Sequence, residues 1–165
     1  MFSLFRLTLV VLIFSFFSSP LTAATQGQVL PEAVKASGLR VYFDVNVGVP
    51  HKLEIRLMLI NKTYDQLLQL GHQPEFVVGF RSTASYFVTK GDEYVEPEEL
   101  VLKKKIHQWV KTLKSKGIRI EQCLLAADFV DIEHEDFLSE MALVKNGYVS
   151  MIIYQSQGFA HVSMD

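Results

Sequence analysis

Hydrophobic and polar positions recur along the chain with two periods, which predict strands and helices in turn. Residues 39–47 (LRVYFDVNV) are rich in Val, Tyr and Phe and lie between two glycines, which is typical of a strand. Residues 50–71 are predicted to be an amphipathic helix, because Pro50 suits a first helical turn and Gly71 a helix end. The apolar side chains of this helix recur at helical spacing: Leu53, Leu57, Ile60, Tyr64 and Leu67.

The middle of the chain repeats this order. Residues 75–80 (EFVVGF) form a nearly continuous apolar run, as buried parallel strands do, and a short helix is predicted over 84–89. A longer helix is predicted over 97–116, because glutamates lie at its start and lysines at its end, which complements the helix dipole. A glycine ends this helix, and residues 118–122 are predicted to be the next strand.

The last third of the chain continues the alternation. The predicted elements are a helix over 124–129, a helical turn over 135–138, a strand over 141–144, a helix over 148–157 and a strand over 159–163. Strands and helices that alternate in this way form a mainly parallel sheet with helices on its faces, joined by right-handed crossovers. The pattern therefore predicts an α/β fold with a mainly parallel sheet.

Residues 1–24 are predicted to be a cleaved secretory signal peptide. Arg6 and the amino terminus form a positive start, residues 7–17 are almost entirely apolar, and a proline and small residues follow. The alternative, an uncleaved membrane anchor, needs about 20 apolar residues, more than this run contains. We expect cleavage after Ala24, with Ala23 as the alternative, and a soluble mature protein in the periplasm.

The composition places the rest of the chain among globular domains. Removing 24 of 165 residues leaves 141, which suits one domain over residues 25–165. With 49% hydrophobic and 21% charged residues, the chain can build a packed core. The formal net charge is −2, and lysines and arginines are interleaved with acids, so no basic patch is predicted. We therefore expect no nucleic-acid partner.

Cys123 is the only cysteine and lies between a predicted strand and a predicted helix. One cysteine cannot form an intrachain disulfide, so an exported protein would hold a free, intermolecularly paired or chemically used thiol. At a helix start the unpaired N–H groups favour the thiolate, which makes Cys123 a candidate nucleophile. The alternative is a buried, inert thiol, because free cysteine is among the most often buried residue types.

Polar residues follow three of the predicted strands at their carboxyl ends. They are Asp44 and Asn46 at the end of the first strand, Arg81, Ser82 and Thr83 after the second, and Cys123 after the third. In parallel sheets, ligands bind beyond the carboxyl ends of the strands, so we expect these residues at one site. Ser82 or Thr83 is expected to cap the helix at 84–89, and in one interpretation the free N–H groups of this helix and the Arg81 guanidinium together hold an anion. The alternative is an ordinary helix cap beside a solvated arginine.

Two charged clusters receive a structural interpretation. The first contains Asp128, Asp131, Glu133, His134, Glu135 and Asp136. A metal site needs ligands that converge with a defined geometry, whereas these residues fit helix caps and solvated turns, so we expect no metal or other cofactor. The second is the lysine run at 103–105, which is interpreted as a solvated helix face because it lies between apolar positions.

Four stretches give the chain a resemblance to a known family. They are FDVN at 43–46, FVVGFR at 76–81, GIRIEQC at 117–123 and VKNGYVSMIIYQSQGFAHV at 144–162. In this layout a strand ends in a cysteine, Asp136 follows, and a glycine turn, a helix and an aromatic-Ala strand close the chain. Over about residues 39–162 the chain resembles the DsrE/DsrF-like family of sulfur-relay proteins. The resemblance implies a flavodoxin-like three-layer sandwich, a homotrimer or homohexamer and, in active members, a cysteine that carries persulfide sulfur, here Cys123.

Two functions of different class follow from this interpretation. The first is a periplasmic sulfur carrier or sulfurtransferase-like protein, in which Cys123 accepts a sulfane sulfur and Arg81 holds an anionic donor that Asp44 or Asn46 orients. Its partners would be a sulfur donor or acceptor protein, or a small sulfur anion. The second is a non-catalytic, homo-oligomeric protein that binds a small anion at the same sheet edge while Cys123 packs in the core.

Overall fold

Five strands form one parallel sheet in the computed structural model, which describes residues 38–165. The strands are β1 (Arg40–Val45), β2 (Glu75–Phe80), β3 (Arg119–Cys123), β4 (Ala142–Val144) and β5 (Ala160–Ser163). Their order across the sheet is β4-β3-β2-β1-β5, and every neighbouring pair is parallel. The predicted signal peptide at 1–24 lies outside the described residues.

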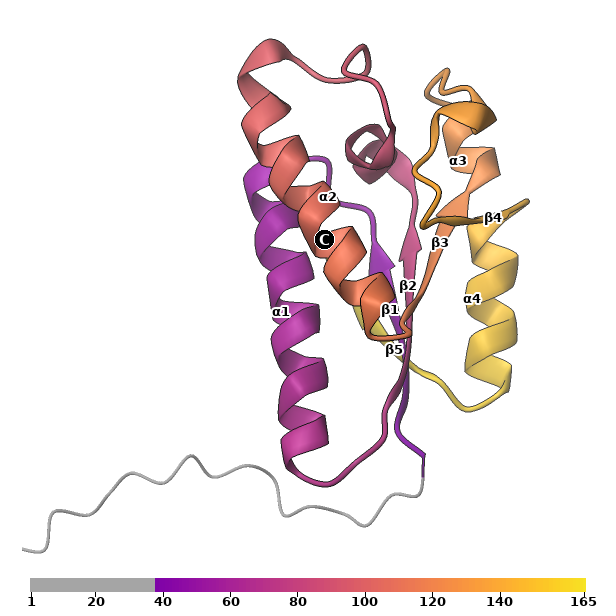
Figure 1. Ribbon diagram of the computed structural model, residues 1–165. Coiled ribbons are helices and arrows are strands. Elements are labelled where there is room, and N and C mark those ends of the chain that lie inside the picture. The colour runs from indigo at the N-terminus through magenta and orange to yellow at the C-terminus, as the bar shows by residue number, and fades with distance from the viewer. Residues whose placement is uncertain (1–37) are drawn as a thin grey trace, which may run out of the picture. The chain divides into compact units, whose positions relative to one another are not determined.

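Helices cover both faces of the sheet (Figure 1). α1 (Pro50–Gln69) and α2 (Leu100–Ser115) lie side by side on one face, and α4 (Gly147–Ser156) lies on the other. The short α3 (Leu124–Asp128) begins directly at the end of β3. Three 3₁₀ helices lie in the connections: η1 (Ser82–Val88), η2 (Pro97–Glu99) and η3 (His134–Asp136). The predicted three-layer α/β architecture is confirmed.

The two faces of the sheet bury different kinds of side chain. Towards α1 and α2 the strands build the main hydrophobic core, which includes Phe43, Val45, Phe76, Val78, Phe80 and Ile120. Towards α4 the apolar contacts are few and centre on Tyr42, Val77 and Phe159. Because side chains alternate between faces along a strand, Asp44 shares the face of Tyr42, and Glu121 lies on this face too. The chemically useful groups of the sheet therefore gather under α4.

The helix signals in the sequence have the expected structural roles. Pro50 lies in the first turn of α1. Gly71 and Gly117 follow α1 and α2 with φ angles of +83° and +79°. Glycine adopts this left-handed conformation without the steric cost of a Cβ, which is why it ends helices.

The turn after β2 differs from the prediction. Neither Ser82 nor Thr83 caps a following helix: η1 begins at Ser82 itself, and no side chain caps it. The expected cap is therefore wrong, because the helix begins two residues earlier than the Ser-Thr pair suggests. Ser82 adopts a φ of +57°, which is uncommon for a residue with a Cβ.

The expected solvated face of lysines is wrong at Lys103, which is only 1% exposed. Its Nζ donates hydrogen bonds to Thr89 Oγ1 at 2.8 Å and to the carbonyl oxygen of Gly91. Burial lowers the pKa of this amine from its ordinary value. The loop after η1 thus supplies acceptors to a lysine on α2, and helical periodicity alone does not reveal such a contact.

Among residues 38–165, no helix has both the length and the apolar content needed to cross a membrane. Over the same range, no group of three or more His, Cys, Asp or Glu side chains is arranged to hold a metal ion. In the acidic segment that follows α3, His134 Nε2 lies 2.7 Å from Asp128 Oδ1.

Candidate functional site

Cys123 lies where β3 ends and α3 begins, and backbone N–H groups point at its sulfur. Sγ accepts hydrogen bonds from the N–H of Gly147 at 3.1 Å and from that of Ala126 at 3.4 Å. Gly147 is the first residue of α4, and Ala126 lies in the first turn of α3. N–H groups at helix starts carry partial positive charge, and two of them are directed at the sulfur of Cys123.

The close approach of α4 to Cys123 depends on a glycine. A Cβ at position 147 would lie 3.0 Å from the Cβ of Cys123 and 3.4 Å from its sulfur. Asn146 caps α4, because its Oδ1 accepts the N–H of Tyr148 at 2.9 Å. The Asn-Gly pair therefore starts a helix and lets its first N–H reach the sulfur.

Glu121 holds α4 against β3. Its carboxylate is 2% exposed and accepts hydrogen bonds from the Tyr154 hydroxyl at 3.0 Å and from the Ser150 hydroxyl. Arg119 Nε donates to the same carboxylate at 2.7 Å, and this hydrogen bond raises the pKa of Arg119. Burial, followed by the charge of Glu121, raises the pKa of Tyr154. Glu121 lies two residues before Cys123 on the same face of β3. Its carboxylate thus holds α4 in position along the strand, close to Cys123.

Arg81 is paired with a buried carboxylate. Its Nε and Nη2 each donate to an oxygen of Asp44 at 2.7 Å, and Asp44 is 4% exposed. The hydrogen bond with Asp44 raises the pKa of Arg81. The remaining Nη1 donates to the Tyr148 hydroxyl at 3.2 Å, and the guanidinium lies 5.0 Å from the Tyr148 ring centroid. His161 Nε2 lies 3.8 Å from Oδ2 of the same carboxylate.

A cavity of about 250 Å³ is lined by both Cys123 and Arg81. It is lined by Arg81, Ser82, Cys123, Leu125, Ala126, Phe129, Val130 and Tyr148. Within this lining, all of it in the described part of the chain, Arg81 is the one charged residue. Ser82, with its left-handed backbone, forms part of the wall, and strained residues of this kind cluster at functional sites.

The structure brings together most of the residues that the sequence predicts for a site. Arg81, Ser82 and Cys123 line the cavity, and Asp44 lies behind Arg81. Thr83 lines a different cavity, of about 610 Å³, whose wall also contains Gly48. Asn46 is half-buried and is not among the residues that line the Cys123 cavity.

Sequence reasoning missed three contributors to this site: Glu121, Gly147 and Tyr148. An acid within an otherwise apolar strand was the available signal for Glu121. The roles of Gly147 and Tyr148 depend on how α4 packs against β3, which no local pattern encodes.

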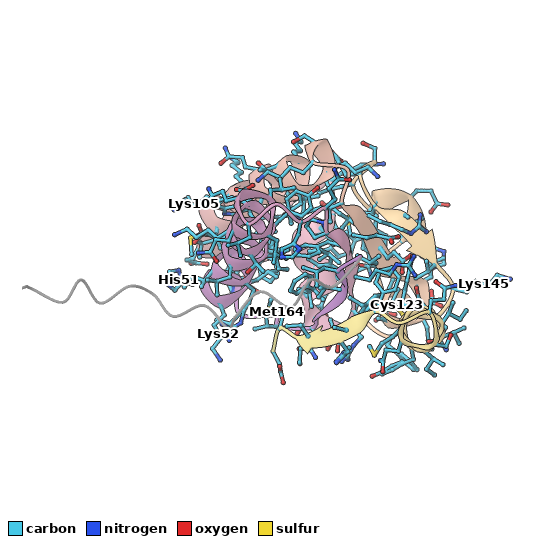
Figure 2. The ribbon with its side chains drawn as sticks, turned by 90° about the horizontal axis from the view of Figure 1, so that it is seen from below. His51, Lys52, Lys105, Cys123, Lys145 and Met164 are labelled. Atoms are coloured by element: carbon cyan, nitrogen blue, oxygen red, sulfur yellow. The ribbon has the colours of Figure 1, made fainter. Side chains whose placement is uncertain are left out.

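Three basic residues of α1 and α2 lie away from the candidate site. In Figure 2, His51, Lys52 and Lys105 project from the side of the domain opposite to Cys123. Lys145, just after β4, points outward beyond the Cys123 side of the domain. The charge at the cavity therefore comes from Arg81.

Large apolar side chains are exposed on the elements around the cavity. This apolar surface consists of Leu125, Phe129, Tyr148, Val149, Ile152 and Ile153. Four of these residues belong to α4, whose ten residues (GYVSMIIYQS) contain no charge. Exposed apolar side chains gathered on one uncharged helix are typical of a surface that a partner covers.

Two solved structures share this fold. The ychN protein from E. coli matches with a TM-score of 0.56 and 12% sequence identity, over 78% of this chain and 99% of that protein. MTH1491 from Methanobacterium thermoautotrophicum, a protein of unknown function, matches with a TM-score of 0.55 and 16% identity over the same shares. At such low identity the match establishes the fold, and it confirms the predicted flavodoxin-like sandwich.

A curated relative matches the sequence itself. An uncharacterized protein of Aquifex aeolicus (strain VF5) is 30% identical over 135 residues, which cover 81% of this chain and 60% of the relative. The chain therefore spans less than two thirds of that protein. No family model matches the chain. The function is consequently argued from the geometry around Cys123.

Proposed function

We propose that this chain, which has the DsrE/DsrF-like fold, is a periplasmic sulfur carrier that holds sulfane sulfur as a persulfide on Cys123. The observation that carries the proposal is the environment of Sγ. The sulfur accepts N–H groups from the starts of α3 and α4, and it lines a cavity at the carboxyl edge of the sheet. A sulfur-accepting cysteine requires hydrogen-bond donors at its sulfur and space for the donor molecule, and Cys123 has both.

The transfer step balances without an external oxidant. The Cys123 thiolate attacks the outer sulfur of a donor R–S–SH, a bond forms between Sγ and that sulfur, and the bond to R–S breaks. The electron pair of the broken bond leaves on R–S⁻, and the proton stays on the transferred sulfur. Delivery reverses the roles, because an acceptor thiolate attacks the outer sulfur and Cys123 leaves as a thiolate. The N–H groups of Gly147 and Ala126 favour that departure.

Export and self-association belong to the same proposal. The predicted signal peptide at 1–24 motivates a periplasmic location, in which the donor and acceptor would also be periplasmic. The apolar surface around α4 supports a homo-oligomer, a trimer or a hexamer as the family resemblance implies. Because Leu125, Phe129 and Tyr148 belong both to this surface and to the cavity wall, assembly would lie close to the site.

One observation favours the non-catalytic alternative. Cys123 is only 2% exposed, as an inert core thiol would be. In that case the cavity would bind a small anion through Arg81 Nη1 and the backbone at the start of η1. Cys123 would then only pack in the protein interior.

Mass spectrometry distinguishes the two functions. The purified protein is incubated with polysulfide near neutral pH, and the intact mass is compared with that of Cys123→Ser. The carrier predicts a gain of sulfur that Cys123→Ser lacks and that dithiothreitol removes. If the native protein gains no sulfur and its thiol reacts with iodoacetamide only after unfolding, the non-catalytic function replaces the proposal.

A further inference from the structure

We propose that the sulfur donor for Cys123 is an organic persulfide with an uncharged, apolar R group, and not a polyanion such as thiosulfate. This inference rests on the proposed function and names the substrate class of the same site. It revises the expectation that Arg81 holds an anionic donor. Two features of the cavity support the inference: the pairing of Arg81 with Asp44 and the apolar wall.

The positive charge of Arg81 is already neutralised. Asp44 binds the guanidinium through both carboxylate oxygens at 2.7 Å, and Tyr148 accepts from Nη1. The guanidinium has five N–H donors, and these three hydrogen bonds use one donor on each nitrogen, which leaves one N–H on Nη1 and one on Nη2. An incoming anion that reached these two N–H groups would also meet the negative charge of Asp44 on the same guanidinium, so the ion pair offers it little net attraction.

The rest of the wall is apolar. Leu125, Ala126, Phe129 and Val130 surround the path to the sulfur, together with the ring of Tyr148. A dianion entering such a space loses hydration, and without paired donors the wall does not replace it. An apolar R group instead gains free energy from the same contacts, because its apolar surface leaves water.

The burial of Cys123 adds a steric reason. Cys123 is 2% exposed and lines the cavity, so a donor must bring its outer sulfur to Cys123 while its R group occupies the cavity. The –SSH group is slim and, in its protonated form, uncharged. Attack by the thiolate then gives Cys–S–SH and R–S⁻, with the balance given above.

Competing donors test this substrate class. The rate of sulfur gain on Cys123 is measured by mass spectrometry with benzyl persulfide, with glutathione persulfide and with thiosulfate. Each rate is divided by the rate of the same donor with N-acetylcysteine, which removes differences in intrinsic reactivity. We expect the normalised rate with benzyl persulfide to exceed those with the two anionic donors by about ten-fold or more.

Charge variants test the reason for the preference. Phe129→Lys places a cation at the cavity mouth, where Phe129 is 81% exposed, so the fold tolerates the change. We expect this variant to gain sulfur from thiosulfate faster. The ratio of the benzyl persulfide rate to the thiosulfate rate should then fall about ten-fold. Val101→Lys makes a similar change on α2, at a residue outside the cavity lining, and should leave the preference unchanged.

The outcomes separate the two proposals. Sulfur gain that is equally fast or faster with thiosulfate overturns the substrate class and leaves the carrier function standing. A preference that shifts equally in Phe129→Lys and Val101→Lys also overturns it, because the effect would then come from net charge. If Cys123 gains sulfur from none of the donors, the carrier function itself is wrong.

Discussion

Glu121 and Ser150 join β3 to α4 by a hydrogen bond that lies one helical turn from the contact between Gly147 and Cys123. β3 ends at Cys123 and α4 begins at Gly147, so the strand and the helix run in opposite directions. The two contacts therefore fix both the distance between α4 and β3 and the rotation of α4 about its axis. Glu121 is thus a positioning residue: it acts on Cys123 through the helix whose first N–H reaches the sulfur.

Ser150→Ala tests this role. Removing the hydroxyl takes one donor from the buried Glu121 carboxylate, so we expect a loss of about 1–3 kcal/mol in the free energy of unfolding. We also expect slower iodoacetamide alkylation of Cys123 near neutral pH, because a shifted α4 withdraws the Gly147 N–H. Ser156→Ala is the matched control, since the Ser156 hydroxyl bonds within α4, to the carbonyl oxygen of Ile153. Equal alkylation rates in the two variants would show that Glu121 has no influence on the thiol.

Gly147→Ala should slow the same reaction. Its Cβ would lie 3.0 Å from the Cβ of Cys123, so the start of α4 must move away and the N–H···S contact lengthens. Alanine is otherwise the better helix former by up to about 1 kcal/mol, so a site without a clash would gain stability. Thermal unfolding therefore gives a clear sign: we expect a lower melting temperature, and a higher one would mean that Gly147 does not pack on Cys123 as described.

The alternation of elements was readable from the sequence because local signals agreed with one another. Pro50 and Gly71 bound α1, and the apolar run of β2 matches its predicted limits at 75–80. The predicted start of the helix after β2 is wrong because Ser82 adopts a left-handed backbone, which a Ser-Thr pair does not indicate. Local propensity thus determines most boundaries, and it fails where tertiary contacts impose an uncommon conformation.

The site was only partly readable for a related reason. Cys123 and Arg81 could be placed at one sheet edge because the carboxyl ends of parallel strands share it. The pairing of Arg81 with Asp44 was not foreseen, since it depends on side chains that are 37 residues apart. That pairing changes the predicted chemistry from anion binding to an apolar cavity, which shows why charge type alone does not specify a ligand.

The buried imidazole of His107 should make the stability of the protein depend on pH. Its Nε2 is buried, and within the described residues it has no hydrogen-bond partner. Burial, and secondly the charge of Lys103, lowers the pKa of His107 below its ordinary 6.5. As the pH falls, His107 therefore binds a proton in the unfolded chain before it does so in the folded protein. The free energy of unfolding consequently decreases as the pH drops from 6.5 towards the lower pKa of His107 in the folded protein. Above pH 6.5, His107 adds no pH dependence to the stability.

Urea unfolding between pH 8 and pH 5 measures this contribution. We expect the native protein to lose stability below pH 6.5 more steeply than His107→Gln, which cannot take up a proton. The difference between the two curves isolates His107 from the other histidines. Parallel curves over this range would mean that His107 is protonated equally in the folded and unfolded states.

The apolar surface on α4 predicts a specific way to break the proposed homo-oligomer. Ile152 is 66% exposed in the single chain and lies in the middle of this uncharged helix, so in an oligomer built on α4 it would be buried. Ile152→Glu would then bury an unpaired carboxylate, which costs several kcal/mol, whereas Val101→Glu places the same charge on a similarly exposed residue of α2. Light scattering should give three or six times the mass of one chain for the native protein and for Val101→Glu, and one chain for Ile152→Glu. A native protein that is monomeric at micromolar concentration, or an Ile152→Glu variant that assembles as the native protein does, would exclude α4 as the interface while leaving the fold and the Cys123 geometry untouched.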